Sequence, residues 1–158
     1  MTAPEYDLAR ALIARLQQQP DLAPAVLDKP FDNEDHAAHL ALSAAQYSMA
    51  VAVSPQPPAS LGAEFDRTGV LQARLGVVVL TTPGVLPGAA AEKLAAASGR
   101  VLALCMGWAP EGRGIPYEAA EVLEVAQLNT AEYPDFKNLG GHVIVLGKKV
   151  NYKMYYNS

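Results

Sequence analysis

The chain is poor in the residues that cross-link a protein, anchor it in a membrane or charge it strongly. Its 158 residues include one cysteine, Cys105, so a disulfide within the chain is excluded and a reducing compartment fits the composition. The longest apolar runs fall far short of the roughly 20 residues that cross a bilayer, and no basic start followed by an apolar run indicates a signal peptide. The sequence therefore predicts a soluble protein, made in the cytoplasm, that does not enter a membrane.

Positive charge is also scarce. The formal net charge is -4, and no run of basic residues is longer than Lys148-Lys149. Tight binding of nucleic acid without sequence preference needs several cations on one face, so the composition disfavours it. An acidic protein can still surround DNA that passes through it without binding the DNA tightly. At this length we expect one domain, 1–158, with a core that needs no disulfide or metal.

The clearest pattern runs from Val70 to Pro110. Residues 70–82 alternate at first and become continuously apolar at 77–80, which predicts a strand whose second half is covered on both faces. Residues 82–88 have turn chemistry and are predicted to form an exposed arm. An alanine-rich helix follows over 89–106, with Gly107 placed to cap its end.

The other predicted elements are shorter. Apolar residues at helical spacing predict an amphipathic helix over 5–19, and Asn33 suits the cap of a second helix over 33–45. Strand 47–54 runs into prolines, so we expect a long loop over 55–69. The remaining predictions are a short edge strand at 25–27, a strand at 120–128, and a hairpin of 142–146 and 150–156 that turns at 147–149.

This order of elements predicts an α+β fold. The sheet is expected to be mostly antiparallel, with two amphipathic helices packed on one face and long Gly/Pro-rich loops at its ends.

No segment has the pattern of a catalytic or metal site. His36 and His39 stand beside Asp32 and Asp35 without a further ligand motif, and an exposed helix start explains them better than a metal. Cys105 lies on an apolar stripe, where a free cysteine behaves as a small hydrophobic residue. Residues 141–149 lack the spacing and the Ser/Thr of a phosphate loop. We therefore predict no catalytic residues, no metal and no cofactor.

Two clusters remain as surface features. Glu118, Glu121 and Glu124 are interpreted as a solvated acidic face, which in a ring around a channel would repel DNA phosphates. Tyr152, Tyr155 and Tyr156 near the C-terminus fit a core position and a subunit contact equally well.

The segment 102–110, which reads LALCMGWAP, carries a resemblance. A helix that ends in a Gly-Trp-x-Pro-like turn, within this order of helices, strands and Gly/Pro loops, resembles the tail terminator (tail completion) proteins of tailed bacteriophages. The resemblance covers most of the chain in order and length.

The resemblance implies a structural virion protein and no enzyme. Such a protein forms a hexameric ring at the head-proximal end of the tail tube, stops tube polymerisation and helps to join the tail to the head. The implied partners are further copies of the chain, the tail tube protein, the sheath protein and the head-tail connector or stopper, while DNA passes through the lumen without specific binding. It would be assembled in the host cytoplasm and found in the tail or neck of the virion.

The contacts of such a ring need two different patches on each subunit. The expected contact residues lie in the loops, in the Gly-Trp turn and at the C-terminus. They are Pro55, Pro57, Pro58, Phe65, Arg67, Pro83, Val85, Leu86, Trp108, Arg113, Tyr152, Tyr155 and Tyr156. Three other readings stay open: another phage neck or baseplate adaptor, a small enzyme, and a ligand-binding α+β domain with a deep apolar pocket.

Overall fold

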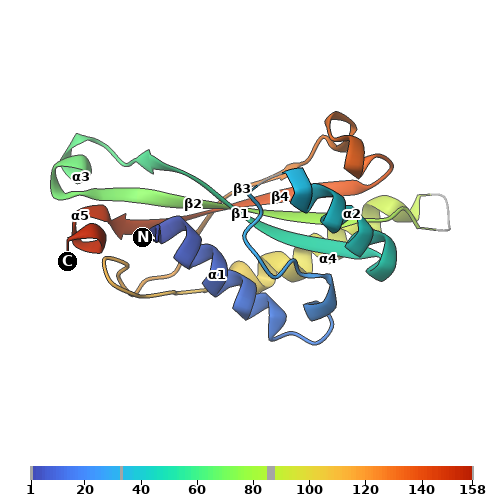
Figure 1. Cartoon of the computed structure of the whole chain (residues 1–158), viewed down its shortest axis with the longest axis horizontal. Helices are drawn as coiled ribbons and strands as arrows, with labels where there is room; N and C mark the ends of the chain where they lie inside the picture. Colours follow the sequence, from blue (N-terminus) through green and yellow to red (C-terminus); the bar gives the residue numbers. More distant parts are fainter. Residues whose placement is uncertain (1, 33, 85–87, 158) are drawn as a thin grey trace.

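The computed structural model describes residues 2–32, 34–84 and 88–157. Four antiparallel strands form one long twisted sheet in the order β1-β2-β4-β3 (Figure 1). The strands are β1 (Met49–Ser60), β2 (Val70–Thr81), β3 (Glu121–Gln127) and β4 (Gly140–Asn151). The α-helices are α1 (Pro4–Gln17), α2 (Glu34–Tyr47), α3 (Ala63–Thr68), α4 (Ala89–Cys105) and α5 (Tyr152–Tyr156). Single turns of 3-10 helix are η1 (Ala23–Ala25), η2 (Thr130–Glu132) and η3 (Pro134–Phe136).

The main core lies between the sheet and the pair α1 and α4. Leu8, Leu12 and Leu16 recur every fourth residue, so they form one stripe of α1, and all three are buried against the sheet. Pro4 suits the first turn of α1, because its missing N–H has no partner there in any helix. The α+β class, the antiparallel sheet and the two helices on one face are confirmed.

The opposite face of the sheet is covered at one end by α2 and η3. Leu40 and Ala44 of α2 pack with Ala50 and Leu80 of the sheet, and Phe136 of η3 joins the same cluster. The second half of β2 is therefore buried on both faces, as the apolar run at 77–80 predicts. Towards the other end of the sheet the side chains of Gln56 and Gln72 lie over Gly76 and Gly147.

The predicted loop at 55–69 is wrong. β1 continues through the prolines to Ser60, and α3 follows between Gly62 and Gly69. Proline is tolerated because β1 is an edge strand, where half of the backbone N–H groups have no ladder partner. The register shifts once, between Gln56 and Ala59, where two of the prolines stand.

The predicted hairpin at 147–149 is also wrong. β4 runs unbroken from Gly140 to Asn151, because β2 has the same length and pairs with it throughout, with Lys148 opposite Ala73. The strand ends where the Asn151 side chain accepts a hydrogen bond from the backbone N–H of Met154, at 2.9 Å, and so caps α5. Residues 152–156 are therefore helical and not a strand.

The segment 25–27 makes less structure than predicted. Val26 forms a single parallel bridge with Val51, and the N–H groups of Leu27 and Phe31 donate to carbonyls of β1 at 2.8 Å. The chain from Val26 to Phe31 thus covers the outer edge of the first half of β1. The predicted cap residue Asn33 lies outside the described residues.

Candidate interaction surfaces

One end of the molecule, which we call the tip, consists of α3, α5 and residues 112–116 (left in Figure 1). β3 begins at Glu121, which pairs with Gly147 of β4. β4 therefore extends four residues beyond the start of β3, and residues 112–116 lie beside this extension. The carbonyl of Gly114 accepts from the N–H of Asn151 at 2.7 Å, and that of Gly69 accepts from Tyr152 at 2.8 Å. Three segments that are distant in the sequence are thereby joined.

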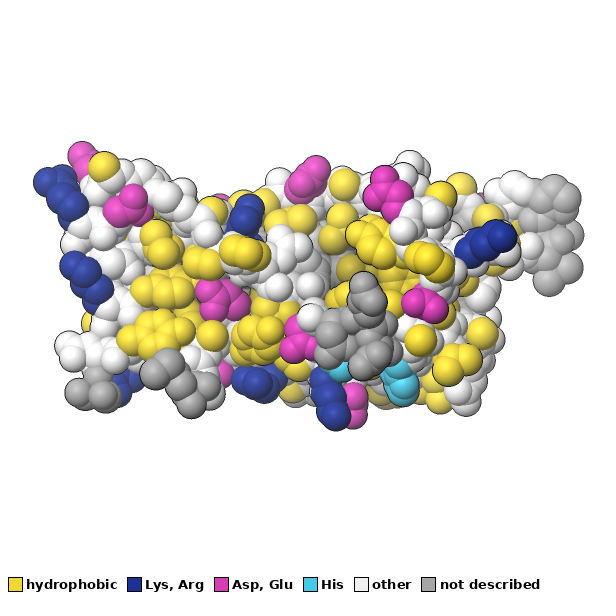
Figure 2. All heavy atoms as spheres, turned by 45° about the horizontal axis from the view of Figure 1, so that its top comes forward, with side chains coloured by type: hydrophobic (Ala, Val, Ile, Leu, Met, Phe, Trp, Pro, Cys, Tyr) yellow, Lys and Arg dark blue, Asp and Glu magenta, His cyan; other side chains and the backbone are white. Residues whose placement is uncertain are grey.

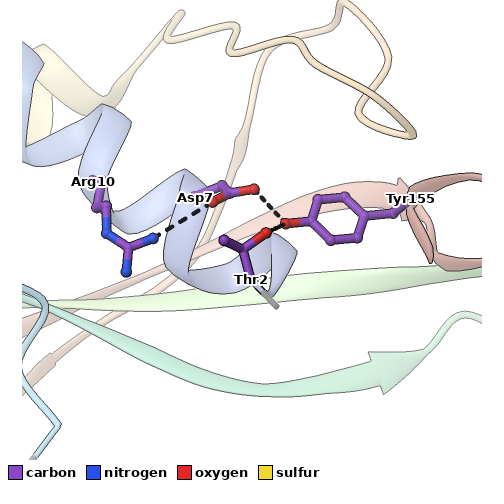
Figure 3. Close-up of polar contacts among 4 residues, drawn as sticks. All are labelled: Thr2, Asp7, Arg10 and Tyr155. Atoms are coloured by element: carbon purple, nitrogen blue, oxygen red, sulfur yellow. Dashed lines mark hydrogen bonds and ion pairs between the residues drawn. The ribbon is translucent and has the colours of Figure 1, made fainter. Parts of the chain in front are cut away.

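Tyrosines of α5 fasten the tip to α1. The Tyr152 hydroxyl donates to Glu5 Oε1 at 2.6 Å, and the Tyr155 hydroxyl donates to the carboxylate of Asp7 (Figure 3). Thr2 Oγ1 lies 2.7 Å from the Tyr155 hydroxyl. Burial and the hydrogen bond to the carboxylate raise the pKa of both phenols, so they remain protonated donors well above neutral pH. The two tyrosines have a structural role within the subunit.

An apolar hollow of about 300 Å³ lies in the tip. Its hydrophobic lining includes Val70, Ile115, Val150 and Met154, and Met154 is 56% exposed. An open hollow with an exposed methionine is a suitable seat for an apolar side chain of another protein.

Basic side chains surround the hollow. Lys149 lines it and lies 5.5 Å from the centre of the Phe65 ring, while Lys153 donates to the carbonyl of Arg67 at 3.1 Å. Arg113 donates to the carbonyl of Met154 at 3.2 Å. Figure 2 shows dark blue side chains at its left end, with magenta ones beside them. Acids of this region include Glu64, Asp66 and Glu111, and Asp66 accepts a hydrogen bond from the Ser60 hydroxyl at 2.9 Å. Glu5 and Asp7 of α1 lie against the tyrosines of α5.

A second surface is the free edge of β3. β3 pairs only with β4, so its outer edge has no neighbouring strand among the described residues. Leu123 is 41% and Val125 is 47% exposed, and the charged residues Glu121 and Glu124 lie in the same strand. Glu118, just before the strand, has a side chain that is 45% exposed. This edge combines apolar contact area with negative charge.

Lys148 is a buried lysine of β4 that lies between the tip and the start of β3. Its side chain is 3% exposed, and its Nζ donates to the carbonyl of Pro116 at 2.5 Å and lies 3.9 Å from Glu118 Oε1. Burial lowers the pKa of Lys148 below its usual 10.5, and the nearby Glu118 opposes this effect. Lys148 holds residues 116–118 against β4.

We expect Lys148→Met to change the pH dependence of stability. The folded pKa of Lys148 is lowered, so between that pKa and 10.5 the unfolded chain binds more protons and the wild type gains stability as pH rises. The variant lacks this gain. Urea unfolding at neutral pH and at a pH just below 10.5 should therefore show the difference, wild type minus variant, increasing with pH. A constant difference would contradict the buried position of the amine.

Cys105 is part of the core. Its side chain is fully buried, and burial raises the pKa of the thiol to about 12, although Arg15 opposes the shift. A catalytic cysteine needs the reverse, a lowered pKa in an accessible position. The interpretation as a core residue is confirmed.

We expect the native thiol to resist modification. At pH 8 the thiolate fraction is very small and reagent access is blocked, so 5,5'-dithiobis(2-nitrobenzoate) should label Cys105 far more slowly in the folded protein than in denaturant. Absorbance at the thionitrobenzoate band measures both rates. Equal rates would mean that α4 opens readily.

Ser98 and His142 are a hydroxyl and a base within hydrogen-bond distance, with Oγ 2.7 Å from Nδ1. Ser98 is buried in the middle of α4 and also donates to the carbonyl of Leu94 at 3.0 Å. Within the described residues His142 has no carboxylate partner, so the pair lacks the third group that orients a catalytic histidine. It joins α4 to β4 as a structural contact.

Metal ligands do not gather in the described part of the chain. No group of three His, Cys, Asp or Glu residues there is placed to hold a metal ion. His36 Nδ1 lies 3.4 Å from Asp32 Oδ1, which is an ion pair when the histidine is protonated. No helix in the described ranges is long and apolar enough to cross a membrane.

The predicted contact residues fall into separate groups. Phe65, Arg67, Arg113, Tyr152, Tyr155 and Tyr156 come together at the tip, and Pro55, Pro57 and Pro58 lie along β1 towards the same end. Pro83 is exposed at the other end of β2, and Trp108 is 6% exposed in the core. Val85 and Leu86 lie outside the described residues. As contacts between subunits, all of these remain predictions.

The sequence matches no protein-family model and no curated protein. Its fold is similar to that of a chain in a solved structure entitled "Virion of native gene transfer agent (GTA) particle". The TM-score is 0.51 at 16% sequence identity, and the alignment covers 94% of this chain and 98% of the other. The similarity therefore concerns the whole fold.

Sequence reasoning missed the free edge of β3 and the buried amine of Lys148. The exposed Leu123 and Val125 alternate with glutamates, which is a signal of an edge strand. The burial of Lys148 has no local signal, because its partner carbonyl lies 32 residues earlier in the chain.

Proposed function

We propose that the chain is a structural subunit of a phage-like virion and acts as a tail terminator. Six copies form a ring at the head-proximal end of the tail tube, stop its polymerisation and contact the head-tail connector. We assign it no enzymatic activity. The observation that carries the proposal is the similarity in fold, over nearly the whole length of both chains, to a chain of a gene transfer agent virion.

The surfaces of the subunit agree with this role. A closed ring built from one kind of subunit needs two different patches that meet. The tip and the β3 edge are two such patches, with different charge and different shape. The partners in this role are other copies of the chain, the tail tube protein, the sheath protein and the connector or stopper. With a net charge of -4 the ring does not bind passing DNA tightly.

The test is assembly of the purified full chain. We expect native mass spectrometry to detect hexamers, and negative-stain electron microscopy to show six-fold rings on one end of tubes formed by the tail tube protein of the same virus. Rings that bind the connector and ignore tube ends would favour a stopper or another neck or baseplate adaptor. A monomer at every concentration, together with no density for it in the virion, would overturn the proposal.

A further inference from the structure

We infer that the ring contact joins the tip of one copy to the β3 edge of the next. This inference rests on the proposed function, since it names the two patches that a ring of this subunit uses. The occupant of each patch is therefore a second copy of the chain, placed head to tail.

Charge is the first argument. The β3 edge carries Glu118, Glu121 and Glu124, and Lys148, which lies 3.9 Å from Glu118, is buried and donates to the carbonyl of Pro116. The tip presents Arg67, Arg113, Lys149 and Lys153 around its hollow. The local acids Glu64, Asp66 and Glu111 reduce this positive charge, and the nearby carboxylates of Glu5 and Asp7 already accept hydrogen bonds from the tyrosines of α5. Opposite charges on the two patches favour contact between them over contact of either patch with its own kind.

Shape and polarity supply the second argument. The tip is hollow, with an apolar lining of Val70, Ile115, Val150 and Met154, and the hollow is about 300 Å³ in volume. β3 exposes two apolar side chains, Leu123 and Val125, close to its glutamates. An apolar side chain enclosed by a rim of paired charges is the usual anatomy of a specific contact.

The positions of the patches give the third argument. The β3 edge is a lateral edge of the sheet, whereas the tip lies at the end of the strands (Figure 1). Two patches on different sides of a subunit generate a rotation from copy to copy, and such a contact can close into a ring. Pairing β3 with β3 of a second copy would place glutamates near glutamates, which is unfavourable.

The test is a charge swap in the full-length protein. At a concentration where the wild type is oligomeric, we expect E121K/E124K to run as a monomer in analytical ultracentrifugation, and R67E/K149E to do the same. The chain with all four substitutions should regain the oligomer, because the contact is restored with its charges reversed. E92K/E132K changes the net charge by the same amount as E121K/E124K, at exposed residues that belong to neither patch, and it should assemble as the wild type does.

Each outcome decides between the proposals. A wild type that is monomeric at all concentrations overturns the ring and, with it, this contact. A wild-type ring that is unchanged by E121K/E124K overturns the contact and leaves the ring. If both double variants are monomeric and the fourfold variant is monomeric too, each patch contacts some other surface, and the pairing of the two patches is overturned. Circular dichroism spectra equal to the wild type's are required of every variant, and R67E alone serves if R67E/K149E does not fold.

Discussion

Leu12→Ala should lower the free energy of unfolding by about 2–5 kcal/mol. Leu12 is fully buried in the stripe of α1 that faces the sheet, so truncation removes apolar contacts and leaves a cavity that the sheet cannot fill. A domain of this size has a total stability of about 5–15 kcal/mol, so the loss is a large part of it. The midpoint of urea unfolding, followed by circular dichroism, measures the change.

Leu42→Ala is the matched control. The same side chain is removed from a helix, but Leu42 of α2 is 70% exposed, and we expect a change of no more than about 0.5 kcal/mol. Similar losses for both variants would contradict the packing of α1 as the cover of the sheet.

Gly114→Ala should have the second largest effect, a loss of about 2 kcal/mol or more. Gly114 has φ +75°, and a Cβ added there would lie 2.6 Å from the carbonyl oxygen of Asn151 and 2.8 Å from the backbone nitrogen of Tyr155. Both atoms belong to the backbone and cannot move aside as a side chain does. Hydrogen exchange should show increased opening of residues 112–116 and of α5, in addition to a lower melting temperature.

Gly99→Ala provides the opposite control. Gly99 lies within α4, and a Cβ added there would meet no atom within 4 Å. Alanine should therefore stabilise the helix by about 0.5–1 kcal/mol, because it restricts the unfolded chain. The glycine therefore does not serve to bring α4 close to the sheet. A stable Gly114→Ala protein would mean that the tip is packed differently.

The sequence predicts best where the signal is local. The apolar run of β2 and the alanine-rich body of α4, with Gly107 at φ +74° after it, have their causes within a few residues. The same holds for α1, whose stripe and terminal prolines define it. The antiparallel α+β architecture follows from these elements.

The failures have causes that lie far away in the sequence. Pro57 and Pro58 are compatible with a strand only because β1 is at the edge of the sheet, which no local pattern reveals. Gly147-Lys148-Lys149 has the composition of a turn, and the equal length of β2 keeps it in a strand. The tip is held by contacts such as that of Tyr152 with Glu5, which are 147 residues apart. From a single sequence we can predict which polar and aromatic residues are candidates for surface contacts. We cannot predict that they come together at the tip.

The two edges of the sheet differ in a way that bears on growth. The outer edge of β1 is covered by residues 26–31 in its first half and carries Pro55, Pro57 and Pro58 in its second. The outer edge of β3 has no neighbouring strand in the part of the chain that the structure describes. A strand can therefore be added on one side only, and addition of copies edge to edge must end after a single pairing. In the terms of polymer chemistry the sheet is a monofunctional unit. A subunit that ends the growth of the tail tube, as proposed, therefore cannot itself grow into a fibre by adding strands edge to edge.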